Sequence, residues 1–446
     1  MLSIFLLLLS WQLHAQSSTN SIHAQWLQKQ YVTQKEAKDH SQDYSEVAFG
    51  WNYFKQKNNW EKAFDGQLLY SLGQSSELYL HLKDAYLAYN VSDLHQFEVG
   101  RKRKNWNQID QTWALGLWEP SLKTDGFNFS REGLTGFYYD TKSGPWHLSL
   151  FASPIFLPDQ GPQVKVEEGQ IISKNRWFYN RVKSVQIGEI ESPLQYNLHM
   201  PEISDIVQQN SVAWEVGWKQ SQAEGLAMKL AFADKPINQL YIGVRPVHNV
   251  SVKNVNHISE IHLYPQVHKH RLYTGELSYK SKVLKLWLSA NVDKPYEQKI
   301  DKVWISPPFV DENIYAIGGD WQWSNNQLGL SYLHRESEEF KNQSIFTSED
   351  LSRLSDRYVF RQATLVNFHR LDTFGKFGQV KFNLRWVHSV KSDADMLSAR
   401  WEYNYFHDWS WIFGGDLIGT KNENNNDFFA INRSNDRIYG GMSYVF

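Results

Sequence analysis

The first residues that invite a chemical reading are histidines with the spacing of metal ligands. His268 and His270 lie two residues apart, so on a strand they share one face, and His257 and His262 are close in sequence. A zinc site needs further ligands at fixed distances, and no carboxylate near these histidines is placed to complete one. Histidines at a solvated strand end are the alternative. The sequence therefore predicts no metal site and no cofactor.

Other chemistry is also scarce. The acidic pairs Glu167-Glu168 and Glu189-Ile-Glu191 are able to bind a divalent cation, although acidic loop residues without a ligand are the simpler interpretation. No nucleophile elbow, phosphate-cradling glycine loop or His–Ser pairing is recognisable, so we predict that the protein is not an enzyme. A formal net charge of −2 argues against nucleic-acid binding. The basic run 101–104 is interpreted as a strand end that reaches solvent.

Two long segments combine aromatic side chains with charges. Segment 154–208 carries Lys174, Arg176 and Arg181 next to Trp177, and segment 104–130 carries Trp106, Trp113 and Trp118. Aromatic rings flanked by polar groups suit stacking on the apolar face of a sugar, and these four tryptophans are the candidates. The alternative is that they pack the segments onto each other or belong to an aromatic belt at a membrane interface.

The elements that must position these residues are strands, because apolar and polar residues alternate over many short stretches. In 379–386, Val380, Phe382, Leu384 and Trp386 take one face, and Lys381, Asn383 and Arg385 take the other. Segments 212–219, 226–232, 283–292 and 397–405 repeat this alternation, and each is about as long as a tilted membrane strand. Aromatic residues make up 15% of the chain and favour a membrane sheet.

The last residues carry the most specific pattern. Ile438, Gly440, Met442, Tyr444 and Phe446 share one face of a strand on which the sequence ends. Such a strand needs a partner for its edge, and pairing with the first strand closes a barrel. With Gly441, Tyr444 and Phe446, this stretch resembles the terminal strand of bacterial outer-membrane β-barrel proteins. The resemblance implies that these three residues are the signal read by the barrel-assembly machinery, and that the protein lies in the outer membrane of a Gram-negative bacterium, in contact with lipid and lipopolysaccharide.

The beginning of the sequence agrees with that location. Residues 1–15 form a short apolar core followed by Ala15, which fits a secretory signal peptide better than a spanning helix. Residues 16–61 are polar, with some helical character, and we predict a periplasmic leader or a small plug. The remainder, 62–446, is assigned to the barrel. There is no Cys, which excludes disulfides and thiolate metal sites.

The predicted fold is therefore all-β: a transmembrane antiparallel up-and-down β-barrel of about eighteen strands, or sixteen if the weak stretch 237–270 fails. Its first strand is placed at 62–72, which we expect to pair with the last strand. The long connections 104–130, 154–208, 294–311, 338–356 and 420–436 all follow odd-numbered strands, whereas the even-numbered strands end in short turns. Long extracellular loops and short periplasmic turns are typical of such barrels.

A barrel of this size leaves an aqueous lumen unless something fills it. We expect 154–208 to fold inward and narrow it, and the charges of the lumen or the constriction are Lys174, Arg176, Arg181, Lys381, Arg385, Arg400, Glu402 and Asp416. The primary hypothesis is a porin-like channel for passive diffusion of small polar solutes or oligosaccharides. The alternative is a non-conducting barrel whose long loops bind, or help to assemble, surface polysaccharide or a partner. The oligomeric state is left open.

Overall fold

The computed structural model describes residues 18–33, 42–72, 77–178, 183–187, 190–221, 224–249, 258–296, 303–305, 309–337, 357–374, 378–405, 408–421 and 427–446. The predicted signal peptide lies outside them. No helix in these ranges is long and apolar enough to cross a membrane.

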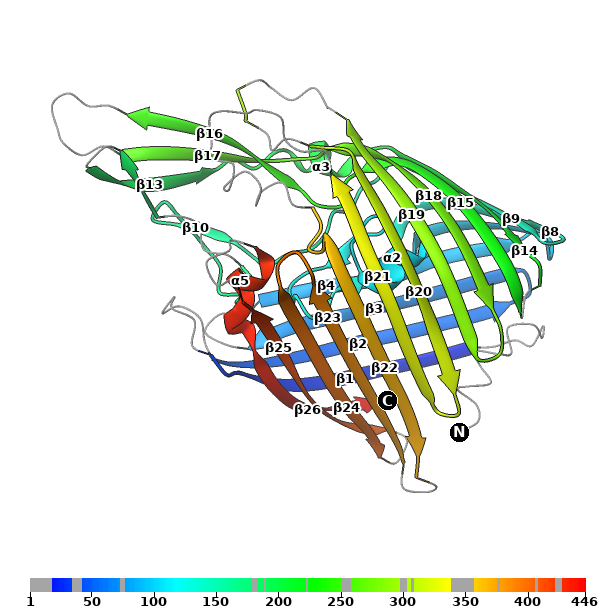
Figure 1. The fold of residues 1–446 in the computed structure, drawn as a ribbon. Helices are drawn as coiled ribbons and strands as arrows, with labels where there is room; N and C mark the ends of the chain where they lie inside the picture. The colour runs from blue at the N-terminus through cyan, green and yellow to red at the C-terminus, as the bar shows by residue number, and fades with distance from the viewer. Residues whose placement is uncertain are drawn as a thin grey trace.

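The architecture is a closed barrel of 18 antiparallel strands, as the alternating pattern predicts (Figure 1). Its strands are β1 (Ser18–Tyr31), β2 (Asp43–Lys57), β3 (Trp60–Leu72), β4 (Glu77–Asn90), β5 (His95–Lys102), β8 (Leu134–Ser143), β9 (Trp146–Ser153), β14 (Ser211–Lys219), β15 (Gly225–Pro236), β18 (Lys269–Lys280), β19 (Leu284–Tyr296), β20 (Glu312–Trp323), β21 (Asn326–Ser337), β22 (Gln362–Thr373), β23 (Gln379–Ser389), β24 (Ala394–Tyr405), β25 (Trp409–Thr420) and β26 (Arg437–Val445).

Closure occurs where β26 pairs with β1, and we call this pair of strands the seam. Gly441 lies opposite Leu27, and a Cβ at Gly441 would come within 2.0 Å of the carbonyl oxygen of Trp26. The backbone N–H of Phe446 donates to the carbonyl of Ile22 at 2.7 Å, so the final residue completes the ladder. The prediction that the last strand pairs with 62–72 is therefore wrong.

The division of the chain at residue 61 is also wrong, because 18–31 and 43–57 form the first two barrel strands. In β2 the side chains of Val47, Phe49 and Trp51 face outward and alternate with Glu46, Ala48 and Gly50, which is the same pattern as in the other strands. The predicted leader is thus part of the wall.

The weak stretch 237–270 is predicted as two barrel strands, and it does form two strands, but they lie outside the barrel. They are β16 (Tyr241–Asn249) and β17 (Ile258–Gln266), which join β12 (Ser184–Ile187) and β13 (Ile190–Leu198) in a second sheet that projects past the long-loop end (Figure 1). Pro246 and Pro265 interrupt these two strands, and proline lacks the N–H that an interior barrel strand must donate. The number of barrel strands is correct because two omissions offset two wrong inclusions.

The remaining elements are short and lie in the long connections. They are β6 (Ser121–Leu122), β7 (Ser130–Arg131), β10 (Lys165–Glu167), β11 (Gln170–Ile172), α2 (Gln108–Trp113), α3 (Ile203–Val207), α5 (Phe428–Asn432) and the 3₁₀ turn η2 (Arg433–Asn435). The long connections gather at one end of the barrel, as predicted, and the short turns gather at the other. β1 begins and β26 ends at the short-turn end.

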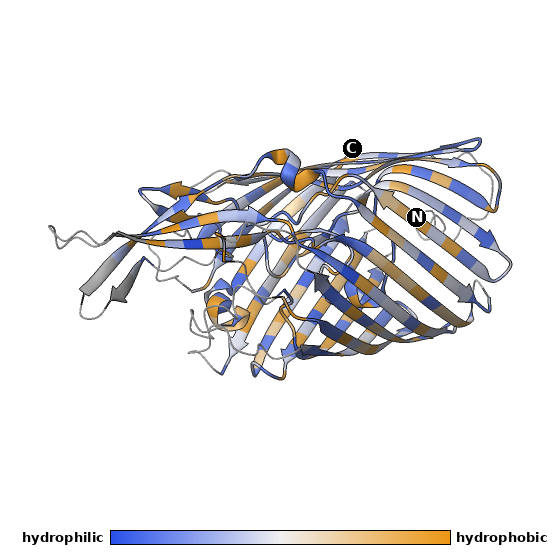
Figure 2. Cartoon of the chain, turned by 90° about the horizontal axis from the view of Figure 1, so that it is seen from above, coloured by the Kyte–Doolittle hydropathy of each residue, from blue (hydrophilic) through white to orange (hydrophobic). Residues whose placement is uncertain are grey.

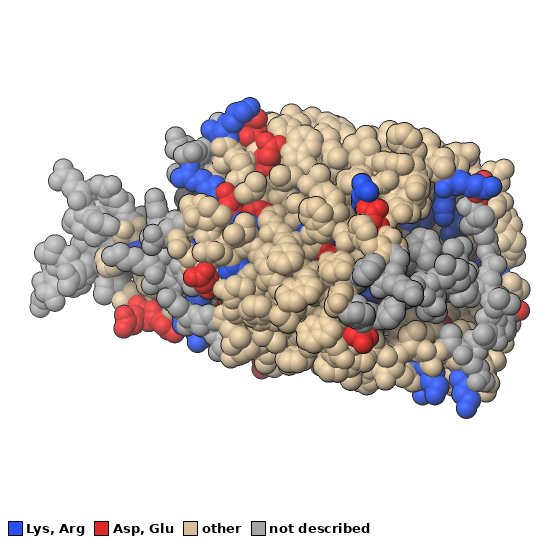
Figure 3. Space-filling model, turned by 90° about the horizontal axis from the view of Figure 1, so that it is seen from below, with Lys and Arg blue, Asp and Glu red and all other residues tan. Residues whose placement is uncertain are grey.

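The outside of the barrel is the surface of a membrane-embedded protein. Exposed leucine, isoleucine and valine side chains occupy its middle, and Lys, Arg, Asp and Glu are sparse over most of the face shown in Figure 3. In Figure 2 the strands show short alternating bands of high and low hydropathy. Exposed aromatic residues line the short-turn end, as expected for an interface belt. They include Trp60, Tyr89, Trp146, Trp321, Trp323, Tyr405 and Trp409.

Candidate functional site

The candidate site is the lumen, and its main occupant is the connection between β5 and β8, residues 103–133, which we call the plug. Its short helix α2 is capped by Asn107, whose side chain accepts a hydrogen bond from the Asp110 backbone N–H at 2.6 Å. The Asp110 carboxylate then accepts the N–H groups of Leu117 at 3.0 Å and Trp118 at 2.7 Å. These bonds fold the chain after α2 back in a compact turn.

The inner face of the barrel wall carries small side chains where the plug packs. Small side chains face inward on successive strands, including Ala213, Ala231, Ala233, Ala316 and Ala363, and the plug's apolar residues pack against them. Polar contacts fix the position: the indole N–H of Trp118 donates to Thr274 at 3.1 Å, and Lys285 donates to Gln108 at 2.7 Å. These contacts fix the plug inside the lumen.

The expected sugar-stacking role of the plug tryptophans is wrong. Trp106, Trp113 and Trp118 are each 1% exposed. Trp106 stacks on Trp118 at 4.9 Å between ring centroids, so neither face of this pair is open to a sugar. Trp177 is half-buried, stacked on Phe428 and in edge contact with Phe127. The alternative, that these aromatics pack the loops onto each other, describes all four.

The basic run 101–104 does not end in solvent, contrary to the prediction. It is the point where the chain leaves the wall and enters the lumen, and each cation meets a carboxylate inside the barrel. The pairs are Arg101 with Glu132 at 2.6 Å, Lys102 with Glu98 at 2.5 Å, Arg103 with Asp65 at 2.9 Å and with Asp84 through its Nε at 2.8 Å, and Lys104 with Asp140.

Arg103 compensates an unfavourable feature of the wall. A β-bulge in β4 inserts Lys83, and it leaves Asp65 of β3 directly opposite Asp84 of β4. Two carboxylates in directly opposed positions repel each other, and the guanidinium of Arg103 binds both Asp65 and Asp84. The side chain of Arg103 is still 34% exposed, so both ion pairs remain accessible to solvent.

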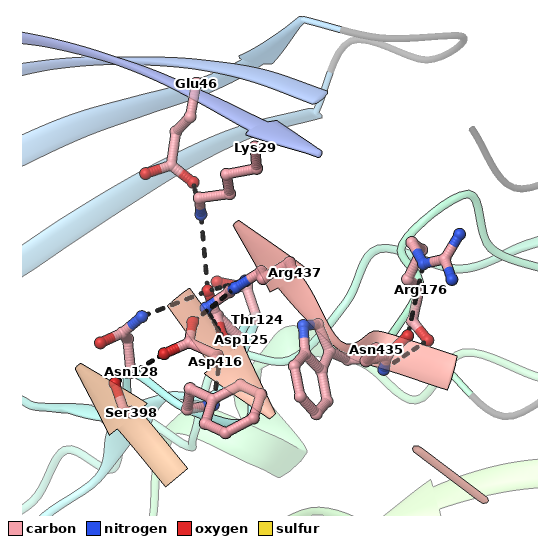
Figure 4. A network of polar contacts seen from close by, with 12 residues as sticks. Lys29, Glu46, Thr124, Asp125, Asn128, Arg176, Ser398, Asp416, Asn435 and Arg437 are labelled. Carbon is pink, nitrogen blue, oxygen red and sulfur yellow. Dashed lines mark hydrogen bonds and ion pairs between the residues drawn. The ribbon is translucent and has the colours of Figure 1, made fainter. Parts of the chain in front are cut away.

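A second polar network joins the plug to the seam (Figure 4). The Asp125 carboxylate of the plug binds Arg437 of β26 at 2.7 and 3.0 Å and Lys29 of β1 at 3.4 Å. Arg437 also binds Asp416 at 2.6 Å, and Lys29 binds Glu46 at 2.8 Å. Burial alone would raise the pKa of Asp125, but the charges of Arg437 and Lys29 outweigh it and hold this pKa below its ordinary value.

Arg176 is not a constriction charge, which corrects the prediction. It is 1% exposed, lies 4.2 Å from the ring centroid of Tyr31, and donates to the carbonyls of Thr33 at 3.0 Å and Ser434 at 2.7 Å. These carbonyls belong to the connections that flank the seam strands at the long-loop end, so Arg176 links the chain just after β1 to the chain just before β26. Segment 154–208 thus contributes mainly to the projecting sheet and to this contact, and it does not form the plug.

Asp416 is also structural, because it is fully buried between Arg437 and Ser398. Lys174 is exposed, and its backbone carbonyl accepts the Tyr44 hydroxyl at 2.7 Å. Lys174 borders a pocket of about 60 Å³ beside the seam network, whose lining includes Tyr44 and Asp125. Arg181 lies outside the described residues.

The predicted inward residues of β23 and β24 do line the lumen together. Lys381 faces Glu402 across the two strands at 3.7 Å, and Arg400 lies 3.6 Å from the same carboxylate. Lys381 is 37% exposed and Arg400 is 35% exposed. Arg385 of β23 also faces inward and lies beside Phe127 of the plug. It forms no hydrogen bond or ion pair with the described part of the chain. This wall therefore carries more positive than negative charge.

The histidines are not assembled into a metal site within the described residues, where no three His, Asp or Glu side chains are grouped to hold an ion. His270 binds Asp293 at 2.8 Å in the barrel interior. His268 packs against Tyr241 and Phe309, and its burial lowers its pKa to about 4. Both side chains are buried, so the interpretation as solvated strand-end residues is wrong. His257 lies outside the described residues.

Comparison with known proteins gives likeness only at the level of structure. No protein-family model matches the chain, and no curated protein matches it either. OccAB4 of Acinetobacter baumannii aligns over 97% of this chain and 99% of its own, with a TM-score of 0.49 and 10% identity. A BenF-like porin from Pseudomonas fluorescens Pf-5 covers the same shares, with a TM-score of 0.48 and 10% identity. For OccK5 of Pseudomonas aeruginosa the shares are 96% and 98%, with a TM-score of 0.47 and 10% identity.

Proposed function

We propose that this protein is a porin-like channel that lets small polar solutes diffuse passively across the outer membrane of a Gram-negative bacterium. The observation that carries the proposal is the exposure of charged side chains inside a closed barrel. Arg103, Lys381 and Arg400 each retain about a third of their side-chain exposure, although strands surround them on all sides. Buried charges paired without water would be costly, so partly exposed ones favour a hydrated passage.

The plug defines the course of this passage. It shares one apolar cluster with inward residues of most barrel strands, among them Val387 of β23 and Met396 of β24 near the long-loop end. The exposed charges lie nearer the short-turn end of β23 and β24, and where the plug leaves β5. A solute would thus move past the plug along this charged part of the wall. Because Lys381, Arg385 and Arg400 outnumber Glu402 there, the passage favours anions or polarised hydroxyl groups.

The experiment is single-channel recording of the purified, folded protein in planar bilayers. We expect discrete conductance steps, and we expect the Lys381→Gln, Arg400→Gln double variant to shift the reversal potential toward cations in a salt gradient. Arg370→Gln is the matched control, because Arg370 is on the outer face, 2.6 Å from Asp372. Absence of channels from folded wild-type protein would refute the proposal, and an equal shift in the control would show that these residues do not line the path.

The projecting sheet favours a second function, binding of surface polysaccharide or a protein partner at the long-loop end. It has its own apolar core of Leu194, Tyr196 and Leu263, so it is an ordered platform (Figure 1). Replacing 241–266 by a short linker would remove β16 and β17. Loss of polysaccharide retention with unchanged conductance would assign binding to this sheet. We also propose that the barrel contacts lipopolysaccharide and that the barrel-assembly machinery recognises Gly441, Tyr444 and Phe446.

A further inference from the structure

Three lysines at the short-turn end form a patch that the channel does not use. Lys55 and Lys57 of β2 and Lys62 of β3 are all exposed, and the alternation of both strands directs them outward, toward the membrane boundary. We call these residues the lysine patch. The register places Lys55 directly opposite Lys62. Like charges in directly opposed positions of a sheet destabilise it.

The lysine patch differs from the other outward-facing cations of the described barrel strands. Arg271 lies 3.3 Å from Asp234, Lys294 lies 3.7 Å from Asp311, and Arg370 lies 2.6 Å from Asp372. The three patch lysines form no ion pair or hydrogen bond with the described part of the chain. Where these three sites supply a carboxylate from the protein, and Lys269 donates to the carbonyl of Asn210 at 3.0 Å, the lysine patch leaves room for an anion from outside.

The surroundings place the lysine patch at the depth of lipid headgroups. Trp60 is exposed and packs on Tyr89 at 4.7 Å between ring centroids, and the exposed Trp51 packs on Phe64 at 4.9 Å. Exposed tryptophan and tyrosine rings at a barrel rim mark the interface between hydrocarbon and water. A lysine here can lie with its aliphatic stem along apolar surface while its ammonium group reaches the phosphate layer.

We propose that the lysine patch binds the phosphate of an anionic glycerophospholipid, such as phosphatidylglycerol, in the leaflet at the short-turn end. One phosphodiester accepts hydrogen bonds from Lys55 and Lys62 together and removes the repulsion between them, while the acyl chains lie against the apolar wall. Lys57 adds charge beside the turn. The site requires only that the barrel is embedded in a membrane, so a failure to conduct would leave it standing.

The test is native mass spectrometry of protein released from vesicles containing equal amounts of phosphatidylglycerol and phosphatidylcholine. Wild-type protein should retain phosphatidylglycerol preferentially, and each lysine removed should weaken retention about fivefold. The Lys55→Gln, Lys62→Gln double variant therefore loses the preference. The Arg271→Gln, Lys294→Gln control, which removes two protein-paired cations, keeps it. Heat-modifiable migration on gels confirms that each variant is folded.

Three results would overturn the proposal. The first is equal retention of both lipids by the wild-type protein, and the second is an equal loss of preference in the patch variant and the control. The third is displacement of the lipid by inorganic phosphate at matched concentration, which would make the lysine patch a site for free anions. High salt should reduce retention by the wild-type protein, since the contact is electrostatic.

Discussion

The carboxylate of Asp125 is the sharpest place to perturb this barrel, because one residue of the plug binds a cation on each strand of the seam. The Asp125→Asn change keeps the size of the side chain but removes its charge. Arg437 then loses a two-point ion pair with distances of 2.7 and 3.0 Å, and Lys29 loses a 3.4 Å contact. We expect the seam and the plug to loosen together.

The magnitude follows from what remains. Leaving a buried charge without a partner costs about 3–5 kcal/mol. Here Arg437 keeps Asp416 and Lys29 keeps Glu46, so neither cation is left alone. The loss is then closer to that of one or two hydrogen bonds between charged groups, about 2–3 kcal/mol of unfolding free energy. A hundredfold change in the unfolding equilibrium corresponds to about 2.7 kcal/mol, so the effect is well within reach of measurement.

The assay is urea unfolding of the folded barrel in detergent or lipid, followed by tryptophan fluorescence, with channel noise as a second readout. Asp393→Asn is the control: its partner Lys421 is 79% exposed, and solvent screens such a surface pair so that it contributes little to stability. Since the pKa of Asp125 is lowered in the folded state, its stabilisation is present above about pH 4, the value of an unfolded aspartate, and is lost as the pH falls further. The difference between wild type and variant should therefore shrink in acid. Equal unfolding free energies of the wild type and Asp125→Asn at pH 7 would refute the role of Asp125 in joining the plug to the seam.

Three further predictions concern sidedness, proton linkage and the terminal residue. Leu384→Arg should destabilise the barrel by about 2–4 kcal/mol if the residue lies near the midplane, whereas Asn383→Asp on the lumen side should cost far less, as measured by urea unfolding in vesicles. Burial raises the pKa of Glu119 to about 8, so its contribution favours folding in acid and is lost as the pH rises from about 4 toward 8. Unfolding free energies measured at several pH values should show this fall in the wild type and not in Glu119→Gln. Deleting Phe446 should reduce the heat-modifiable folded form in outer membranes, and an unchanged yield would contradict its role in assembly.

The wall of the barrel was predictable because each strand carries its own local signal. Val380, Phe382 and Leu384 face outward and Lys381 and Arg385 face inward, as period-2 alternation requires. The same signal was present in β2, but the polar stretches 25–29 and 35–38 suggested helical character and led to the assignment of 16–61 as a leader. Proline at 246 and 265 was the available sign that β16 and β17 are not barrel strands.

The plug was not predictable from local pattern, because its position depends on contacts between distant parts of the chain. Asn107 bonds to Asn291, and the Asp110 turn places Trp118 against Thr274. The sequence did contain a trace of this packing, in the form of three tryptophans in a segment without alternation. Segment 154–208 was the longer connection, but the inward alanines of the wall favour the segment with the bulky apolar residues.

The plug and segment 154–208 both bind at the seam. The plug contributes Asp125, which binds the side chains of β1 and β26, and segment 154–208 contributes Arg176, which binds backbone carbonyls just beyond the same strands. Both contacts need β1 and β26 to be adjacent, so neither is complete before the barrel has closed. Stability at the seam is thereby coupled to the position of the plug. A change that moves the plug also weakens the contacts that hold β1 and β26 together.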